Sequence, residues 1–228
     1  MRYALPLLAL ATFASLPAFA EDTFKGLKPV DPDGDCTIEA DAGGLSISIP
    51  GTPHDLSIEL GRMNAPQALR RVMGDFIAEV KVAGSIKPDG ATIPERLAYQ
   101  GSGLLLIQDP RTYIRLERAA VARPGELLRY VSFEVREDRR RVAVQSQRLA
   151  DDGDLWLRLE RRSDRILASI SPDGDRWKSL EPVKIELGET LQIGVAAVNA
   201  ADQPFDTRFE AFRLFLPDET SAPDAESP

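Results

Sequence analysis

The stretch Gly101–Arg118, GSGLLLIQDPRTYIRLER, constrains the fold of this chain more than any other. Leu104–Ile107 is continuously apolar, which is typical of a strand that is covered on both faces. Asp109–Thr112 supplies a turn, because proline presets φ and an aspartate side chain bonds to the nearby backbone. The side chains of Tyr113–Glu117 alternate between polar and apolar, so they face opposite sides of a strand. We therefore expect a β-hairpin whose second strand has one core face and one polar face.

Short alternating runs separated by Gly, Pro and Asp turns occur along the rest of the chain. Leu45–Ile49, Asp75–Val82 and Leu155–Arg161 each place apolar side chains at every second position. The last run, Thr207–Leu216, is apolar on both sides and is expected to be a central strand, with Phe209 and Phe212 on opposite faces. No segment keeps a 3.6-residue period for more than about two turns. The pattern predicts an all-β protein.

The two ends of the chain differ in composition from its middle. Met1–Ala20 combines Arg2, an apolar run and an Ala-Phe-Ala cleavage signal, which predicts a signal peptide and a secreted or periplasmic protein with no membrane span after cleavage. Residues 21–35 are expected to be an irregular lead-in, residues 36–216 the folded domain, and residues 217–228 a disordered acidic tail.

Charge and cysteine content exclude several classes of protein. The formal net charge of −8 argues against nucleic-acid binding, which needs clustered Lys and Arg, and the short Arg clusters are expected to be solvated. Cys36 is the only cysteine, so no internal disulfide can form. Asp31–Asp35 lacks the Gly and Glu of a calcium loop, and we predict a turn there, with no metal and no cofactor. His54, the only histidine, is interpreted as a hydrogen-bonded loop residue unless a catalytic partner lies near it.

Four segments together resemble a known family. They are Gly103–Leu106, Tyr113–Glu117, Trp156–Leu159 and Ser171–Trp177. The chain resembles the domain of unknown function 1349 family, also labelled regulation of enolase protein 1, within the concanavalin A-like lectin and glucanase superfamily. The likeness spans roughly residues 36–216. It implies a jelly-roll sandwich of two antiparallel sheets, one of them concave. Relatives are secreted bacterial proteins and accessory domains of xylan-degrading glycosidases, which implies contact with glycans.

The candidate ligand-binding residues are aromatic and polar side chains, and period-two counting places several of them on the polar face of adjacent strands. Aromatic faces stack on sugar rings, and fixed Arg and Glu groups bond to hydroxyls. The alternative interpretation of each is a solvated face with weak cross-strand ion pairs. The candidates are Tyr99, Gln100, Tyr113, Arg115, Glu117, Glu134, Trp156 and Arg158.

These residues lead us to expect a secreted, non-catalytic β-sandwich domain that binds a polysaccharide or other glycan on its concave sheet. One alternative is a glycoside hydrolase or lyase that uses carboxylates from separate strands, since the glucanase motif E-[ILV]-D-x-x-E is absent. A second alternative is a structural or protein-interaction module of the cell envelope. The carboxylates considered for hydrolysis are Glu79, Glu117, Glu134 and Glu160.

Overall fold

The structure is a computed structural model that describes residues 24–90 and 96–216. The predicted signal peptide and acidic tail lie outside the described residues. Within the described ranges, no helix is both long enough and apolar enough to span a bilayer.

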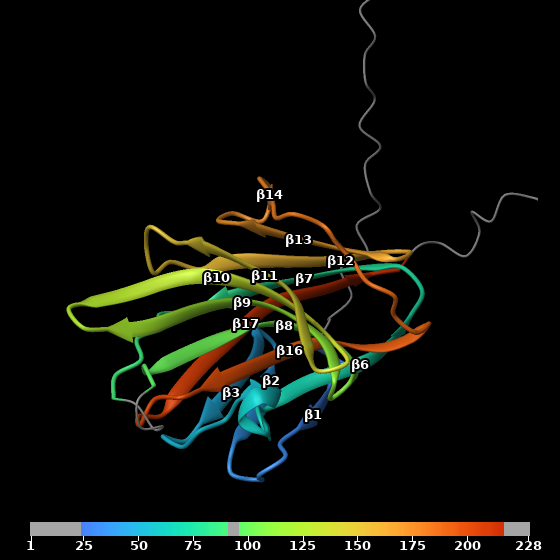
Figure 1. The fold of residues 1–228 in the computed structure, drawn as a ribbon. Coiled ribbons are helices and arrows are strands. Elements are labelled where there is room, and N and C mark those ends of the chain that lie inside the picture. The colour runs from blue at the N-terminus through green and yellow to red at the C-terminus, as the bar shows by residue number, and fades with distance from the viewer. Residues whose placement is uncertain (1–23, 91–95, 217–228) are drawn as a thin grey trace, which may run out of the picture.

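The described residues form two large antiparallel sheets stacked as a sandwich, which confirms the predicted fold class (Figure 1). In spatial order the first sheet contains β1 (Lys28–Val30), β6 (Gln67–Met73), β16 (Thr190–Asn199), β8 (Tyr99–Asp109), β9 (Thr112–Arg123), β10 (Glu126–Glu137) and β11 (Arg140–Arg148). The second contains β14 (Lys178–Ser179), β13 (Arg165–Ser171), β12 (Leu155–Arg162), β7 (Phe76–Ala83), β17 (Phe205–Phe215), β3 (Gly44–Ile49) and β2 (Thr37–Asp41), with β15 (Val183–Lys184) also paired to β13. Part of the lead-in is ordered, because β1 adds to the edge of β6.

The core lies between the inward faces of the two sheets. Leu104, Leu106, Ile114 and Leu116 of the first sheet are at most 1% exposed and pack in this cluster with apolar residues of the second sheet. Burial of such side chains contributes about 1.5–3 kcal/mol each, so this layer supplies most of the stability of the fold.

The predicted hairpin is confirmed as β8 and β9, which pair with Leu104 opposite Leu116. Its turn is held by Asp109, whose Oδ1 accepts hydrogen bonds from the backbone N–H groups of Arg111 and Thr112. Both faces of β8 are covered, as the apolar run predicted. Leu105 points away from the main core into a second apolar cluster.

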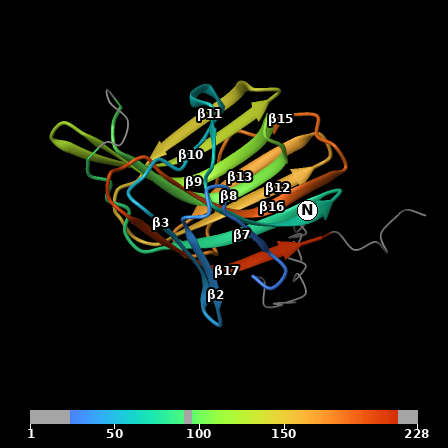
Figure 2. The same cartoon turned by 90° about the horizontal axis from the view of Figure 1, so that it is seen from below.

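A segment comprising residues 54–66 covers the outward face of the first sheet, and we call it the cover segment. It contains β4 (Leu56–Ser57), the short 3-10 helix η1 (Ile58–Leu60) and β5 (Arg62–Met63). Leu56 and Ala65 pack against Leu105 and Tyr113. Figure 2 shows the segment crossing β8, β9 and β10. The outward face of this sheet is therefore partly buried.

The strict two-residue period fails in β17. A register shift between Glu210 and Arg213, with Ala211 at a φ of 47°, inserts a bulge opposite β7. A bulge adds one residue to one strand and so reverses which side chains face inward. Phe209 and Phe212 are consequently both fully buried in the main core, and the prediction that they lie on opposite faces is wrong. The prediction that this strand is central is correct, since it lies between β7 and β3.

Gly103 marks a point of very close approach between β8 and β9. A Cβ atom at this position would lie 2.1 Å from the carbonyl oxygen of Leu116, which belongs to the neighbouring backbone and cannot move independently. Only glycine fits there without displacing one of the two strands.

We predict that Gly103→Ala lowers the free energy of unfolding by about 1–3 kcal/mol, the range for inserting a methyl group into filled space. Urea denaturation followed by far-ultraviolet dichroism measures the change. Gly153→Ala is the control, because its nearest neighbour would be a side-chain oxygen of Asp151 at 3.3 Å in an exposed loop. Equal stability of the two variants would contradict the proposed backbone contact.

Candidate functional site: a charged basin on the first sheet

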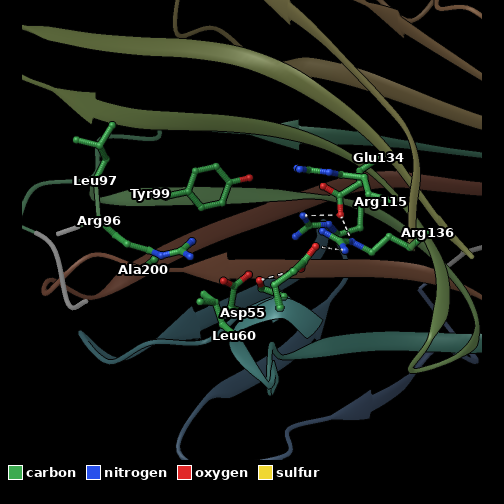
Figure 3. Close-up of a pocket in the computed structure, with 12 residues that line it drawn as sticks. Asp55, Leu60, Arg96, Leu97, Tyr99, Arg115, Glu134, Arg136 and Ala200 are labelled. Atoms are coloured by element: carbon green, nitrogen blue, oxygen red, sulfur yellow. Dashed lines mark hydrogen bonds and ion pairs between the residues drawn. The ribbon is translucent and has the colours of Figure 1, made fainter. Parts of the chain in front are cut away.

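A pocket of about 610 Å3 lies between the cover segment and the outward face of the first sheet, and we call it the basin (Figure 3). Its volume falls in the range of small-molecule sites. Its lining comes from four parts of the chain: the cover segment, the residues preceding β8, the strands β8 to β11, and the residue after β16. The lining residues are Asp55, Ser57, Glu59, Leu60, Arg96, Leu97, Tyr99, Arg115, Glu134, Arg136, Arg141 and Ala200.

Arg115 of β9 is the central charged group of the basin. Its side chain is 12% exposed, and its Nη2 lies 3.3 Å from Oε1 of Glu134, which is directly opposite on β10. Oε1 of Glu117, two residues further along β9, lies 3.9 Å from Nη1 of Arg115 and accepts a 2.5 Å hydrogen bond from the Tyr99 hydroxyl. Alternation along the strands puts these groups on one face, and pairing brings them together.

Arg136 connects this group to the cover segment. Its Nε donates a 2.5 Å hydrogen bond to Oε1 of Glu134, and its Nη1 pairs with Glu59 of η1. Its guanidinium also lies 5.9 Å from the centre of the Tyr113 ring. The ion pair with Glu59 holds one wall of the basin against the sheet.

Burial changes the ionisation of several of these groups. Burial raises the pKa of Glu117, and the nearby Arg115 only partly opposes this rise. Burial likewise raises the pKa of Asp55, again opposed by Arg115. For Arg115 burial lowers the pKa, but the carboxylates of Glu117 and Glu134 outweigh it and raise the pKa overall. The guanidinium therefore remains charged.

The structure brings four of the eight candidates together at the basin, namely Tyr99, Arg115, Glu117 and Glu134. Tyr113 shares their face but lies beneath the cover segment, where it is fully buried and its hydroxyl donates to the carbonyl oxygen of Leu56. The face is thus covered rather than solvated.

Gln100 does not belong to this group. It lies one residue from Tyr99 on β8 and therefore faces the opposite way, toward the interior. It is buried, and its Nε2 donates a 3.2 Å hydrogen bond to Oδ1 of Asn199. Its placement on the ligand face is wrong because neighbouring residues of a strand cannot share a face.

Trp156 and Arg158 lie on the other sheet. They belong to β12, which pairs with β7 and β13 and not with any strand of the first sheet. Arg158 pairs with Glu79, directly opposite on β7, and its guanidinium lies 3.8 Å from the centre of the Trp177 ring. Grouping these two residues with the basin is incorrect, because the sequence showed their alternation but not their sheet.

Several lining residues were missed by the sequence analysis. Arg136 follows Glu134 by two residues on β10, so the same period would have found it. Arg141 belongs to a cluster that was expected to be solvated, and it is exposed as expected while also lining the basin. Arg161 of another such cluster is buried, and its Nη1 donates to the carbonyl oxygen of Gly188. Asp55 and Glu59 reach the basin through loop placement, for which the sequence holds no periodic signal.

His54 lies outside the basin, beside the lead-in. Its Nε2 is 2.9 Å from Oδ1 of Asp35, and its Nδ1 is 3.0 Å from the carbonyl oxygen of Thr52. This agrees with the interpretation of His54 as a hydrogen-bonded loop residue. Cys36 is nearby, but burial raises the pKa of its thiol to about 12, which does not favour a nucleophilic thiolate. Asp35, Cys36 and His54 have the donor types of a metal site.

Comparison with known proteins identifies both a sequence family and a shared fold. The sequence profile of the family described as "Protein of unknown function (DUF1349)" matches residues 54–215. No curated protein sequence matches the chain.

Three solved structures illustrate the shared fold. A functionally unknown protein from Saccharomyces cerevisiae has a TM-score of 0.68 and 12% identity over 86% of this chain and 98% of its own. The GH43 protein BlXynB from Bacillus licheniformis has a TM-score of 0.60 and 14% identity, over 82% of this chain but 35% of its own. Lectin I-B4 from Griffonia simplicifolia has a TM-score of 0.52 and 14% identity, over 87% and 97%. The predicted concanavalin A-like jelly roll is confirmed.

The raised pKa of Glu117 predicts a pH dependence of stability. A carboxyl group whose pKa is higher in the folded state than in the unfolded state stabilises the fold at pH values below its unfolded-state pKa of about 4.3. This stabilisation is lost as the pH rises through the folded-state pKa. We expect Glu117→Gln, which keeps an acceptor for the Tyr99 hydroxyl, to lose less stability than the wild type as pH rises from 4.

Urea denaturation of both proteins at intervals between pH 4 and pH 8 measures this difference. Taking the difference between the two curves removes the contributions of the other carboxylates. A difference that stays constant over this range would contradict the assignment of a raised pKa to Glu117.

Proposed function

This chain belongs to the DUF1349 family, and from that premise we propose that it is an exported, non-catalytic β-sandwich protein that binds carbohydrate in the basin. The observation that carries the proposal is the combination of apolar and fixed polar groups in one hollow. The Tyr99 ring, Leu60 and Leu97 supply apolar surface, while Arg115 and Glu134 are held by ion pairs. A sugar has apolar C–H faces and hydroxyl groups on its rim, and such a site complements both.

Binding is favoured over hydrolysis because Glu117 and Glu134, the two carboxylates considered for hydrolysis that lie at the basin, are already engaged. Glu134 forms ion pairs with the guanidinium groups of Arg115 and Arg136. Glu117 accepts a hydrogen bond from the Tyr99 hydroxyl. An acid and base pair needs one carboxyl group free to give a proton and another free to take one. Of the other two carboxylates considered, Glu79 and Glu160 both belong to the second sheet.

Known relatives of the fold are consistent with this proposal. The similar structures include a lectin and a GH43 protein of which the chain spans about a third. At 14% identity these likenesses concern the fold, so the ligand proposal depends on the residues of the basin.

We predict that Tyr99→Ala weakens glycan binding roughly tenfold, because loss of a ring contact costs about 1.5 kcal/mol. A glycan array of neutral and acidic plant and bacterial polysaccharides identifies the ligand, and isothermal titration calorimetry then measures its affinity. Trp156→Ala is the matched control, since it removes an aromatic ring from the opposite sheet. Thermal unfolding verifies that both variants are folded.

Other outcomes would favour other functions. Weaker binding by Trp156→Ala alone would move the site to the second sheet. Release of reducing sugar during incubation would favour the hydrolase alternative. The absence of binding to any glycan would overturn the proposal and favour a structural module of the cell envelope.

Export is tested separately from binding. We predict that the full chain, expressed in a bacterial host, is cleaved after Ala20 and recovered from the periplasm or medium with Glu21 as its first residue. Mass spectrometry of the intact protein determines the new N-terminus. Replacing Ala18 and Ala20 by Arg should block cleavage, because the processing site requires small residues at these positions. An uncleaved cytoplasmic wild-type protein would contradict the prediction.

A further inference from the structure

We propose that Asp35, Cys36 and His54, together with Asp33, form a binding site for a thiophilic divalent cation such as Zn2+, separate from the basin. The donor atoms of Asp35, Cys36 and His54 all lie within 4.8 Å of one another. One imidazole nitrogen, one thiol and two carboxylates are the ligand types that zinc takes in proteins. This inference goes beyond the proposed carbohydrate binding and does not depend on it.

The spacing of the donors fits a four-coordinate ion. Zinc bonds of about 2.0–2.3 Å imply donor-to-donor distances of roughly 3.3–3.7 Å around a tetrahedron. Nε2 of His54 lies 2.9 Å from Oδ1 of Asp35 and 3.8 Å from Oδ2 of Asp33. Sγ of Cys36 lies 3.7 Å from Oδ1 of Asp35. These three distances lie near the tetrahedral value, and the donors of Asp35, Cys36 and His54 would draw together from separations of up to 4.8 Å when an ion enters.

The surrounding residues orient the histidine toward the site. Nδ1 of His54 faces the carbonyl oxygen of Thr52, which needs a donor, so the proton resides on Nδ1 and the lone pair of Nε2 points at the carboxylates. In this tautomer Nε2 presents a lone pair that a cation beside Asp35 can share. Metal-bound histidines are held in the same way, by a carbonyl oxygen on the other nitrogen.

The backbone around the donors is also fixed. His54 exchanges two backbone hydrogen bonds with Asn199, at 2.8 and 2.9 Å, and is 1% exposed. Nδ2 of Asn64 donates a 2.6 Å hydrogen bond to Oδ2 of Asp33, which positions that carboxylate. The donors are therefore held in place by residues that are not ligands themselves.

Asp31, next to these donors, has a buried carboxylate oxygen without a partner in the described part of the chain. Oδ1 of Asp31 is buried and has no hydrogen-bond partner among the described residues, while its Oδ2 accepts the backbone N–H of Cys36. An unpaired buried carboxylate oxygen is costly. A cation beside Cys36 would compensate this charge.

Binding has a defined proton balance. A metal–sulfur bond forms, the S–H bond of Cys36 breaks, and the proton passes to solvent. Because zinc binds cysteine as the thiolate, the metal must displace that proton, and affinity should rise with pH.

The test uses the full-length purified protein, treated with a chelator and then titrated with Zn2+ or Ca2+ alone. We expect one Zn2+ per chain by calorimetry and a higher thermal unfolding midpoint, with little effect of Ca2+. Co2+ should give a thiolate-to-cobalt absorption band in the near ultraviolet. Cys36→Ser should abolish this band, and Cys36→Ser or His54→Gln should each weaken Zn2+ binding by at least about 100-fold, since even residues behind the ligands contribute 10–100-fold.

Asp175→Asn, in an exposed turn remote in sequence from the cluster, is the control and should bind Zn2+ like the wild type. No Zn2+ binding by the wild type, unchanged affinity in both ligand variants, or tighter binding of Ca2+ than Zn2+ would each overturn the proposal. A His54→Gln variant that fails to fold leaves Cys36→Ser and the cobalt band to decide. Because the probe is the metal alone, these outcomes are independent of whether the basin binds a glycan.

Discussion

The buried charge of Arg115 is the constraint on which the functional half of this structure depends. An arginine on an outward strand face normally extends into water, but here the cover segment lies over it and leaves 12% of its side chain exposed. Such a charge is tolerated only with paired carboxylates, and removal of one partner from a buried pair costs about 3–5 kcal/mol. Glu134 opposite and Glu117 alongside balance the charge, while Nε and Nη1 of Arg115 have no hydrogen-bond partner among the described residues. Arg136 then extends the pairing to Glu59, so the charges that pair with Arg115 also fix the wall of the basin.

The second sheet shows what the same cross-strand motif does without a cover. Arg158 and Glu79 are directly opposite each other, as Arg115 and Glu134 are on the first sheet. There the guanidinium stacks on the ring of Trp177, and neither member of the pair lines the basin. The same ion pair therefore has a different setting on each sheet. The difference is the additional layer that residues 54–66 place over one sheet and not over the other.

Strand alternation explains how much of this could be predicted from the sequence. The double-sided run Leu104–Ile107 correctly predicted a strand buried on both faces, and the alternation after Thr112 correctly grouped Arg115 with Glu117. Period-two counting could not assign strands to sheets, so Trp156 and Arg158 were grouped with the wrong strands. It also could not detect the bulge at Ala211, where one extra residue reverses the pattern of β17. Asp55 and Glu59 escaped prediction because their positions depend on how a loop folds back over the sheet.

The cover segment connects the two proposed sites, because it contributes residues to both of them. His54 precedes Asp55, and Asn64 uses its Nδ2 for Asp33 while its Oδ1 accepts the backbone N–H of Asp55. The lead-in therefore holds both ends of the cover segment, one through His54 and the other through Asn64. Glu59, midway between them, is fixed to the sheet by Arg136. A loop of this length that is attached at its two ends and its centre has little freedom to move. The basin is therefore expected to be preformed. Ligand binding then does not have to order this wall, which would cost conformational entropy.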